Sequence, residues 1–309
     1  MALLAEYALT PDVFDATSYS SAEVCGLHLQ ALKEVLLHEG LVRDLRDGAW
    51  IKLFGQTARP WHPRGRELLK KLGTQRRLVP AHAALPQPPA NDADWCDEAL
   101  ASHRLLPVAG VVVTDAIAAL HASTPIVSSV AKLTSAAWWT ARSPSVRLRR
   151  NFADYHVALD LVLRNANSLM FIDPHIDPSD VHQYSDLMRL LQTLQPRSIK
   201  PLVEIHRVAW YGKGNNKIPD VPAVLAAFQP LGAVAKATGI AFDVFLWADF
   251  HDRYLISDLI GVSLPHGFST TRSLTAFTTW SRLGRAERDL TQRDFDPAHS
   301  PPVHRFQVK

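Results

Sequence analysis

The chain has few cysteines and no long apolar run. Cys25 and Cys96 are the only cysteines among its 309 residues, and they form no C-x-x-C pair. Two cysteines build no disulfide framework, which favours a reducing compartment. No apolar stretch reaches the roughly 18 residues of a membrane-spanning helix, and residues 1–15 meet acid and proline too early for a signal peptide. We therefore expect a cytoplasmic protein with no membrane span.

Several catalytic signatures are also missing from the sequence. It contains no G-x-S-x-G nucleophile elbow, no Walker loop and no dinucleotide-binding fingerprint. It has no large excess of one charge either, since 33 lysines and arginines stand against 30 acids, for a net charge of +3. That balance neither requires nor excludes a polyanionic partner, so any basic surface must be local.

What the chain does have is a globular composition, with 47% hydrophobic and 20% charged residues. The pattern predicts four segments. Residues 1–80 have apolar residues at helical spacing and form a helical, partly basic module. Residues 81–104 contain HAALPQPPAND at 82–92, which indicates a Pro-rich linker. Residues 105–149 form a connecting α/β segment, and residues 150–309 form the largest domain.

The last segment predicts an α/β fold. Short apolar runs at 169–172 and 201–208 are typical of buried strands, and residues 154–165 and 184–194 have helical periodicity. Strands that alternate with helices of this length favour a sheet covered by helices.

One motif concentrates the polar chemistry of this segment. His251, Arg253 and Asp258 have the spacing H-x-R-x-x-x-x-D and surround the apolar run 254–256, which predicts a strand. On a strand, His251 and Arg253 point the same way, so an imidazole and a guanidinium stand side by side. The alternative is a purely structural role, in which His251 is hydrogen-bonded at a strand end and Arg253 is paired with a neighbouring acid.

This motif resembles the H-x-K-x-x-x-x-D motif of the phospholipase D superfamily, and Asp173-Pro174-His175 resembles the Asp-Pro-Tyr segment of many single-motif members. The resemblance covers residues from about 150 to 309 and implies a mixed sheet flanked by helices. The chain departs from the pattern at Arg253, where lysine is usual. Arginine keeps the charge and binds phosphate as a fork, but its reach and geometry differ.

The resemblance implies cleavage of a phosphodiester without a metal or cofactor. Arg253 would hold a non-bridging oxygen, His251 would attack phosphorus to form a phosphohistidine, and Asp258 would orient groups in the site. The superfamily uses a second histidine to protonate the leaving group. Because the chain has one motif, that group comes either from a second copy in a homodimer or from His175 or His206.

Further candidates surround the motif. Ser269 and Thr270 offer hydroxyls to a phosphate. Glu287 matches a glutamate of single-motif nucleases at loosely similar spacing, although a charge on a helix surface is the simpler explanation. The arginines of residues 142–150 either form a charged exposed loop or contact nucleic acid; the candidates for contact are Arg147, Arg149 and Arg150.

We therefore expect a phosphodiesterase, and a nuclease before a phospholipase, because arginine clusters at 64–77 and 142–150 flank the motif and no membrane-binding amphipathic stretch is evident. By analogy with small prokaryotic members, a role in restriction or defence is expected. The alternatives are a phospholipase and a non-catalytic module that binds nucleic acid, membrane or a protein partner.

Overall fold

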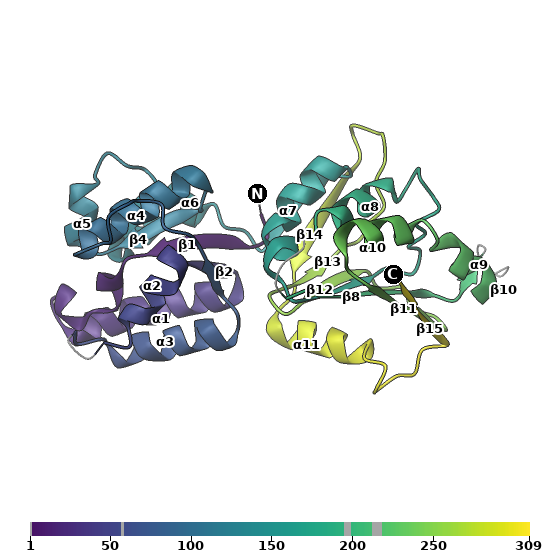
Figure 1. Cartoon of the computed structure of the whole chain (residues 1–309), viewed down its shortest axis with the longest axis horizontal. Helices are drawn as coiled ribbons and strands as arrows, with labels where there is room; N and C mark the ends of the chain where they lie inside the picture. The colour runs from purple at the N-terminus through teal and green to yellow at the C-terminus, as the bar shows by residue number, and fades with distance from the viewer. Residues whose placement is uncertain (1, 57–58, 195–198, 212–217) are drawn as a thin grey trace. The chain divides into compact units, whose positions relative to one another are not determined.

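A computed structural model describes residues 2–56, 59–194, 199–211 and 218–309 of the chain. The chain divides into two compact units (Figure 1). The N-terminal unit spans Leu4–Ser143, and the C-terminal unit spans Pro144–Lys309 together with the residues before Leu4.

A parallel sheet forms the centre of the N-terminal unit. Its described strands have the order β3-β2-β1-β4-β5, so the chain moves outward from β1 and then returns to its other side. Such doubly wound sheets have helices on both faces, which makes their strands apolar throughout. The strands are β1 (Ala5–Leu9), β2 (Gly40–Asp44), β3 (Leu78–Pro80), β4 (Gly110–Val113) and β5 (Val127–Ser129).

Helices cover this sheet, with α1 and α3 on one face and α4 and α5 on the other (Figure 1). The Ser21 hydroxyl accepts a hydrogen bond from the Val24 backbone N–H and caps α1. The helices are α1 (Ala22–His38), α2 (Leu45–Leu53), α3 (Pro63–Thr74), α4 (Asp92–Leu105), α5 (Asp115–Leu120) and α6 (Ala137–Thr140), with 3₁₀ helices at Pro11–Phe14, Ala16–Ser18 and Val130–Ser135.

The structure corrects the expected boundaries in this half of the chain. Residues 4–80 and 105–143 belong to one α/β unit, not to a helical module and a connecting segment. The predicted linker, 81–104, is part of that unit as well. Its second half is α4, and its first half is held by the buried Glu98 carboxylate, which accepts hydrogen bonds from the backbone N–H groups of Ala84 (2.6 Å) and Leu85 (3.2 Å).

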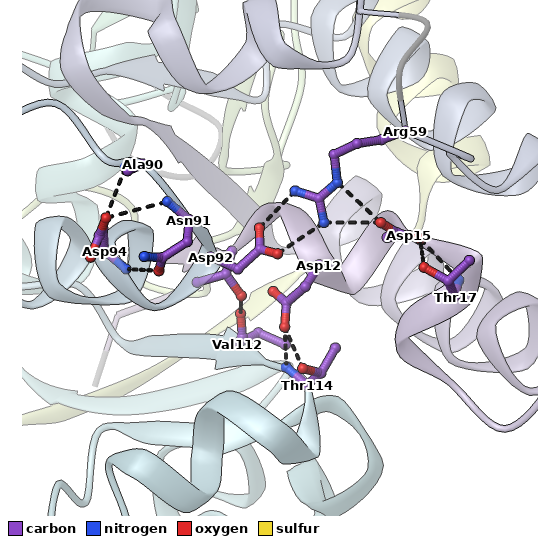
Figure 2. A network of polar contacts seen from close by, with 11 residues as sticks. Asp12, Asp15, Thr17, Arg59, Ala90, Asn91, Asp92, Asp94, Val112 and Thr114 are labelled. Carbon is purple, nitrogen blue, oxygen red and sulfur yellow. Dashed lines mark hydrogen bonds and ion pairs between the residues drawn. The ribbon is translucent and has the colours of Figure 1, made fainter.

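A polar network lies at the carboxyl ends of β1 and β4 (Figure 2). Arg59 binds both oxygens of Asp92, at 2.8 and 2.9 Å, and also binds Asp15. Asp12 accepts hydrogen bonds from the backbone N–H and hydroxyl of Thr114 through Oδ2. Asp12 is 3% exposed, and within the described part of the chain its Oδ1 has no hydrogen-bond partner. Burial raises the pKa of Asp12, and the charge of Asp92 raises it further.

The C-terminal unit contains a mixed sheet, which confirms the expected sheet flanked by helices. Across the described residues its order is β15-β11-β8-β7-β12-β13-β14-β6, in which β7, β8 and β11 are parallel and the other neighbours antiparallel. The strands are β6 (Ser145–Arg149), β7 (Ser168–Ile172), β8 (Leu202–Val208), β11 (Phe242–Trp247), β12 (Tyr254–Ser257), β13 (Gly261–Ser263), β14 (Phe277–Arg282) and β15 (His304–Val308); β9 (Trp210–Tyr211) and β10 (Ile218–Pro219) pair separately.

Two helical layers enclose this sheet: α7, α8 and α10 lie over one face and α11 over the other (Figure 1). Under α11, a core of Met170, Ile172, Phe245, Trp247, Ile256 and Phe295 fills one side of the sheet. The helices are α7 (Phe152–Asn165), α8 (Ser185–Gln192), α9 (Val221–Ala227), α10 (Leu231–Thr238) and α11 (Arg285–Asp294).

Taken one at a time, the helices of the described chain are too short or too polar to cross a membrane. Only the bent pair α9 and α10, with 49° between them, meets the length and composition of a span in combination.

Candidate functional site

A polar pocket of about 580 Å³ opens at one end of the strands of the C-terminal sheet. The antiparallel pairing of β7 with β12 sets Ile172 opposite Tyr254. The residue after β7, Asp173, therefore meets the residue before β12, Arg253. The ionisable and polar groups that line the pocket are Arg150, Asp173, His175, Asp177, Asp180, Gln183, Tyr184, Arg253, His266 and Ser269.

Asp173 forms the buried floor of this pocket. It is 1% exposed, and its carboxylate accepts hydrogen bonds from the backbone N–H groups of His175 (2.9 Å) and Phe268 (3.2 Å). Burial raises the pKa of Asp173, although these hydrogen bonds and the charge of Arg253 oppose the rise. Gly267 makes the arrangement possible: its φ is +60°, and a Cβ there would lie 1.8 Å from Oδ2 of Asp173.

Arg253 enters the pocket, but His251 is absent from its lining. The structure corrects the expected strand, because β12 starts at Tyr254 and both residues precede it. Nη1 of Arg253 donates to the backbone carbonyl of His251 at 3.3 Å, and the His251 side chain is exposed. The two groups are thus neighbours along the chain, not side by side on one strand face.

Asp258 lies at the opposite end of β12. Its carboxylate accepts hydrogen bonds from the backbone N–H groups of Asn167 (2.9 Å) and Ser168 (3.4 Å). These contacts hold the start of β7. Asp258 does not line the pocket, so any influence on it passes through the β7–β12 pair.

Arg150 places a second guanidinium in the pocket, next to Ser269. Nη2 of Arg150 donates to the Ser269 hydroxyl at 2.6 Å, and the Tyr155 hydroxyl donates to the Ser269 carbonyl at 3.2 Å. Burial raises the pKa of Tyr155 to about 12, so this donor keeps its proton. Thr270 is buried beside them, where its backbone N–H donates to the Gln183 carbonyl at 2.8 Å, and it is not in the lining.

The other two predicted arginines lie elsewhere. Arg147 and Arg149 are exposed on β6, outside the pocket lining. Their side chains alternate with the buried Val146 and Leu148, as expected for a strand with one covered face. The arginines of 147–150 are therefore divided between two surfaces, and Arg142 is paired with Glu39 in the N-terminal unit.

The structure separates the two predicted second histidines. His175 lines the pocket, with its ring 5.7 Å from that of Trp210 in an edge-on contact. His206 is fully buried on β8, where Nδ1 accepts a hydrogen bond from the Trp247 indole N–H (3.1 Å) and the ring stacks on Phe245. Burial lowers the pKa of His206, and His206 does not line the pocket.

Glu287 is exposed on α11, outside the pocket lining. Its charge contributes to the raised pKa of Tyr254, after the larger effect of burial and that of Asp252. This position matches the helix-surface alternative.

His266 is a pocket residue that sequence reasoning missed. Its Nδ1 lies 3.2 Å from the hydroxyl of Thr278, which is 3% exposed on β14. That hydrogen bond orients the ring and leaves Nε2 for a ligand. His266 belongs to no motif, and the only signal is its place in the Pro265-His266-Gly267 turn that follows β13.

Two acids of the lining shape the loop after β7. Asp177 accepts hydrogen bonds from the backbone N–H and hydroxyl of Ser179, and Asp180 accepts them from the N–H groups of His182 and Gln183. Among the side chains that the structure describes, no group of three or more His, Cys, Asp or Glu is arranged to hold a metal ion.

The chain matches no family model and no curated protein. Among solved structures, a TrmBL2 chain is similar; it is an archaeal chromatin protein described as showing a novel mode of DNA binding. The two are 11% identical, the match covers 78% of this chain and 82% of that one, and the TM-score is 0.29. At that TM-score the match supports no inference about fold or function.

Proposed function

We propose that the protein is a metal-independent phosphodiesterase of the phospholipase D type that cleaves nucleic acid in the cytoplasm, as a restriction or defence nuclease would. One observation carries the proposal: two arginines, Arg150 and Arg253, and two histidines, His175 and His266, converge on one pocket. Guanidinium groups bind phosphate as a fork and stabilise the charge that builds up on its oxygens.

The chemistry follows from these groups and from the neighbouring His251. Arg253 and Arg150 hold the non-bridging oxygens, and a ring nitrogen of His251 attacks phosphorus. The bond from phosphorus to the leaving oxygen breaks, and that oxygen takes a proton from Nε2 of His266. Water then attacks the phosphohistidine, gives a proton to His266, and releases the phosphate monoester and free His251.

This assignment places the acid in the same chain. Thr278 orients His266 much as a third residue orients the base of a catalytic triad, so a monomer contains every group named. The expected homodimer remains the alternative, in which His251 of a second copy supplies the proton. Sedimentation of the active protein decides between them, since a dimer that loses activity on dilution favours the second copy.

The cleavage test uses labelled single- and double-stranded DNA and RNA in EDTA. We expect cleavage by the wild type, and a loss of 10²-fold or more in His251→Ala, Arg253→Ala and His266→Ala. The matched control is His182→Ala, because His182 is exposed on the same loop system and does not line the pocket. Full activity in His251→Ala would overturn the assignment of the nucleophile.

One observation favours the rival function, a pocket that binds phosphate without turnover: the His251 side chain lies outside the lining. In that case nucleic acid binds in EDTA, Arg253→Ala weakens binding, and no variant changes cleavage because none occurs. Phosphatidylcholine in mixed micelles serves as the lipid substrate in parallel. Its hydrolysis without nucleic acid cleavage would identify a phospholipase.

A further inference from the structure

β6 and β14 form one edge of the C-terminal sheet, and this strand pair, which we call the ribbon, has one covered and one open face. On the covered face, Val146 and Leu148 are buried beside Trp280, whose ring lies 4.3 Å from that of Tyr155 on α7. Because side chains alternate along a strand, the residues between them point to the other face. On that face the side chains of Arg147, Arg149, Phe277 and Thr279 are exposed, so core packing does not explain its composition.

Arginines and an aromatic ring occupy the open face. Cross-strand pairing sets Arg149 opposite Phe277 and Arg147 opposite Thr279. Phe277 is 40% exposed, and the guanidinium of Arg147 lies over its ring at 4.7 Å. Within the described residues no ion pair joins either guanidinium to an acid, and both side chains are exposed to solvent. We call Arg147, Arg149, Phe277 and Thr279 the ribbon strip.

Each part of the strip matches one part of a nucleotide. A guanidinium that lies over an aromatic ring forms with it a platform on which a base can stack, and the paired side chains lose little conformational freedom when the base binds. Arg149, one residue pair along, carries the charge that a backbone phosphate needs. In a duplex the base faces are stacked on one another, so this platform serves unpaired bases.

We propose that the ribbon strip binds single-stranded DNA or RNA and guides it toward the pocket. The choice of nucleic acid as partner rests on the proposed function. Two consecutive residues connect the two surfaces. Arg149 belongs to the ribbon strip, and the guanidinium of Arg150 donates a hydrogen bond to the Ser269 hydroxyl in the pocket. Thr278, next to Phe277, orients His266 from the other face of the same strand.

The test measures anisotropy of fluorescein-labelled 12-nucleotide oligo-dT, oligo-rU and a DNA hairpin duplex with the full chain in EDTA. We expect Phe277→Ala and Phe277→Leu to weaken single-strand binding about ten-fold and to leave duplex binding unchanged. Arg147→Ala and Arg149→Ala should each lower the salt dependence of single-strand binding by about 0.7 in log–log slope. The controls Leu290→Ala and Arg293→Ala, on exposed positions of α11, should change neither.

Unchanged affinity in both Phe277 variants overturns the proposal, as does binding to phosphatidylserine vesicles without binding to oligonucleotides. Arg253→Ala separates this proposal from the proposed function, since it removes cleavage but keeps the Phe277-dependent binding. If the wild type shows that binding and never cleaves, the proposed function fails and the ribbon strip stands. If the wild type cleaves and the Phe277 variants bind and cleave normally, the ribbon-strip proposal fails and the proposed function stands.

Discussion

Oδ1 of Asp173 lies 3.6 Å from Nε of Arg253, behind the pocket that both residues line. The same carboxylate accepts hydrogen bonds from the backbone N–H groups of His175 and Phe268. Asp173 thus connects the end of β7, the start of β12 and the turn at Gly267, and it sets the position from which Arg253 reaches a ligand.

Replacing Asp173 by asparagine should lower the free energy of unfolding by about 1–3 kcal/mol, because an amide NH₂ would face one of the two buried backbone N–H groups. Urea denaturation measures the loss. Asp249→Asn is the control, since Asp249 is exposed, and its effect should stay within about 0.5 kcal/mol. An unchanged midpoint in Asp173→Asn would mean that this carboxylate does not hold the pocket together.

Gly267→Ala should destabilise the C-terminal unit by more than about 1 kcal/mol, because the left-handed backbone and the 1.8 Å approach to Asp173 both exclude a Cβ. Gly232→Ala is the matched control: a Cβ at this position of α10 has nothing within 4 Å. It should stabilise by about 0.5–1 kcal/mol. Thermal melts of the two variants should therefore shift in opposite directions.

His206 should make stability depend on pH. Burial lowers its folded-state pKa, so below about pH 6.5 the unfolded chain binds a proton that the folded chain rejects. Stability therefore falls from pH 7 toward pH 5. In His206→Gln, the amide oxygen can still accept a hydrogen bond from Trp247. The loss of stability caused by protonation of residue 206 should disappear, and the slope of stability against pH should flatten. His182→Gln, at an exposed position, should keep the wild-type slope; equal slopes in all three proteins would contradict the account.

Asp12→Asn should raise the free energy of unfolding at neutral pH by about 1 kcal/mol, because it removes a buried charge whose pKa is raised and which Asp92 repels. Asp92→Asn is the opposite case, since it breaks the two-point contact with Arg59 and should destabilise. Chemical denaturation of both variants checks the sign, and a loss of stability in Asp12→Asn would show that the charge is needed.

Local patterns predicted much of the C-terminal unit. The helical periodicity of 154–165 corresponds to α7, and the apolar run at 169–172 corresponds to β7, because each buries one face or both. In the N-terminal sheet, β1 was missed for a physical reason. β1 reads AEYAL, without a β-branched residue, so its strand signal is weak and burial between two helical layers decides its conformation.

The residues of the candidate site were also only partly predictable from the sequence. Arg253 stands out in the sequence because its spacing to His251 and Asp258 forms a motif. His266 does not, because its partner Thr278 and its approach to the pocket arise only when β13 and β14 fold back toward β12. The side-by-side placement of His251 and Arg253 depended on where the strand starts, and boundaries are set by tertiary pairing more than by local pattern.

In the proposed mechanism, His251 forms a covalent bond to phosphorus. The direct measurement is an alkaline quench of the wild type with a labelled single-stranded oligonucleotide in EDTA, followed by mapping of the modified peptide. We expect a nucleotide adduct on His251 that is absent in His251→Ala. Cleavage without an adduct, or an adduct on another residue, would contradict it.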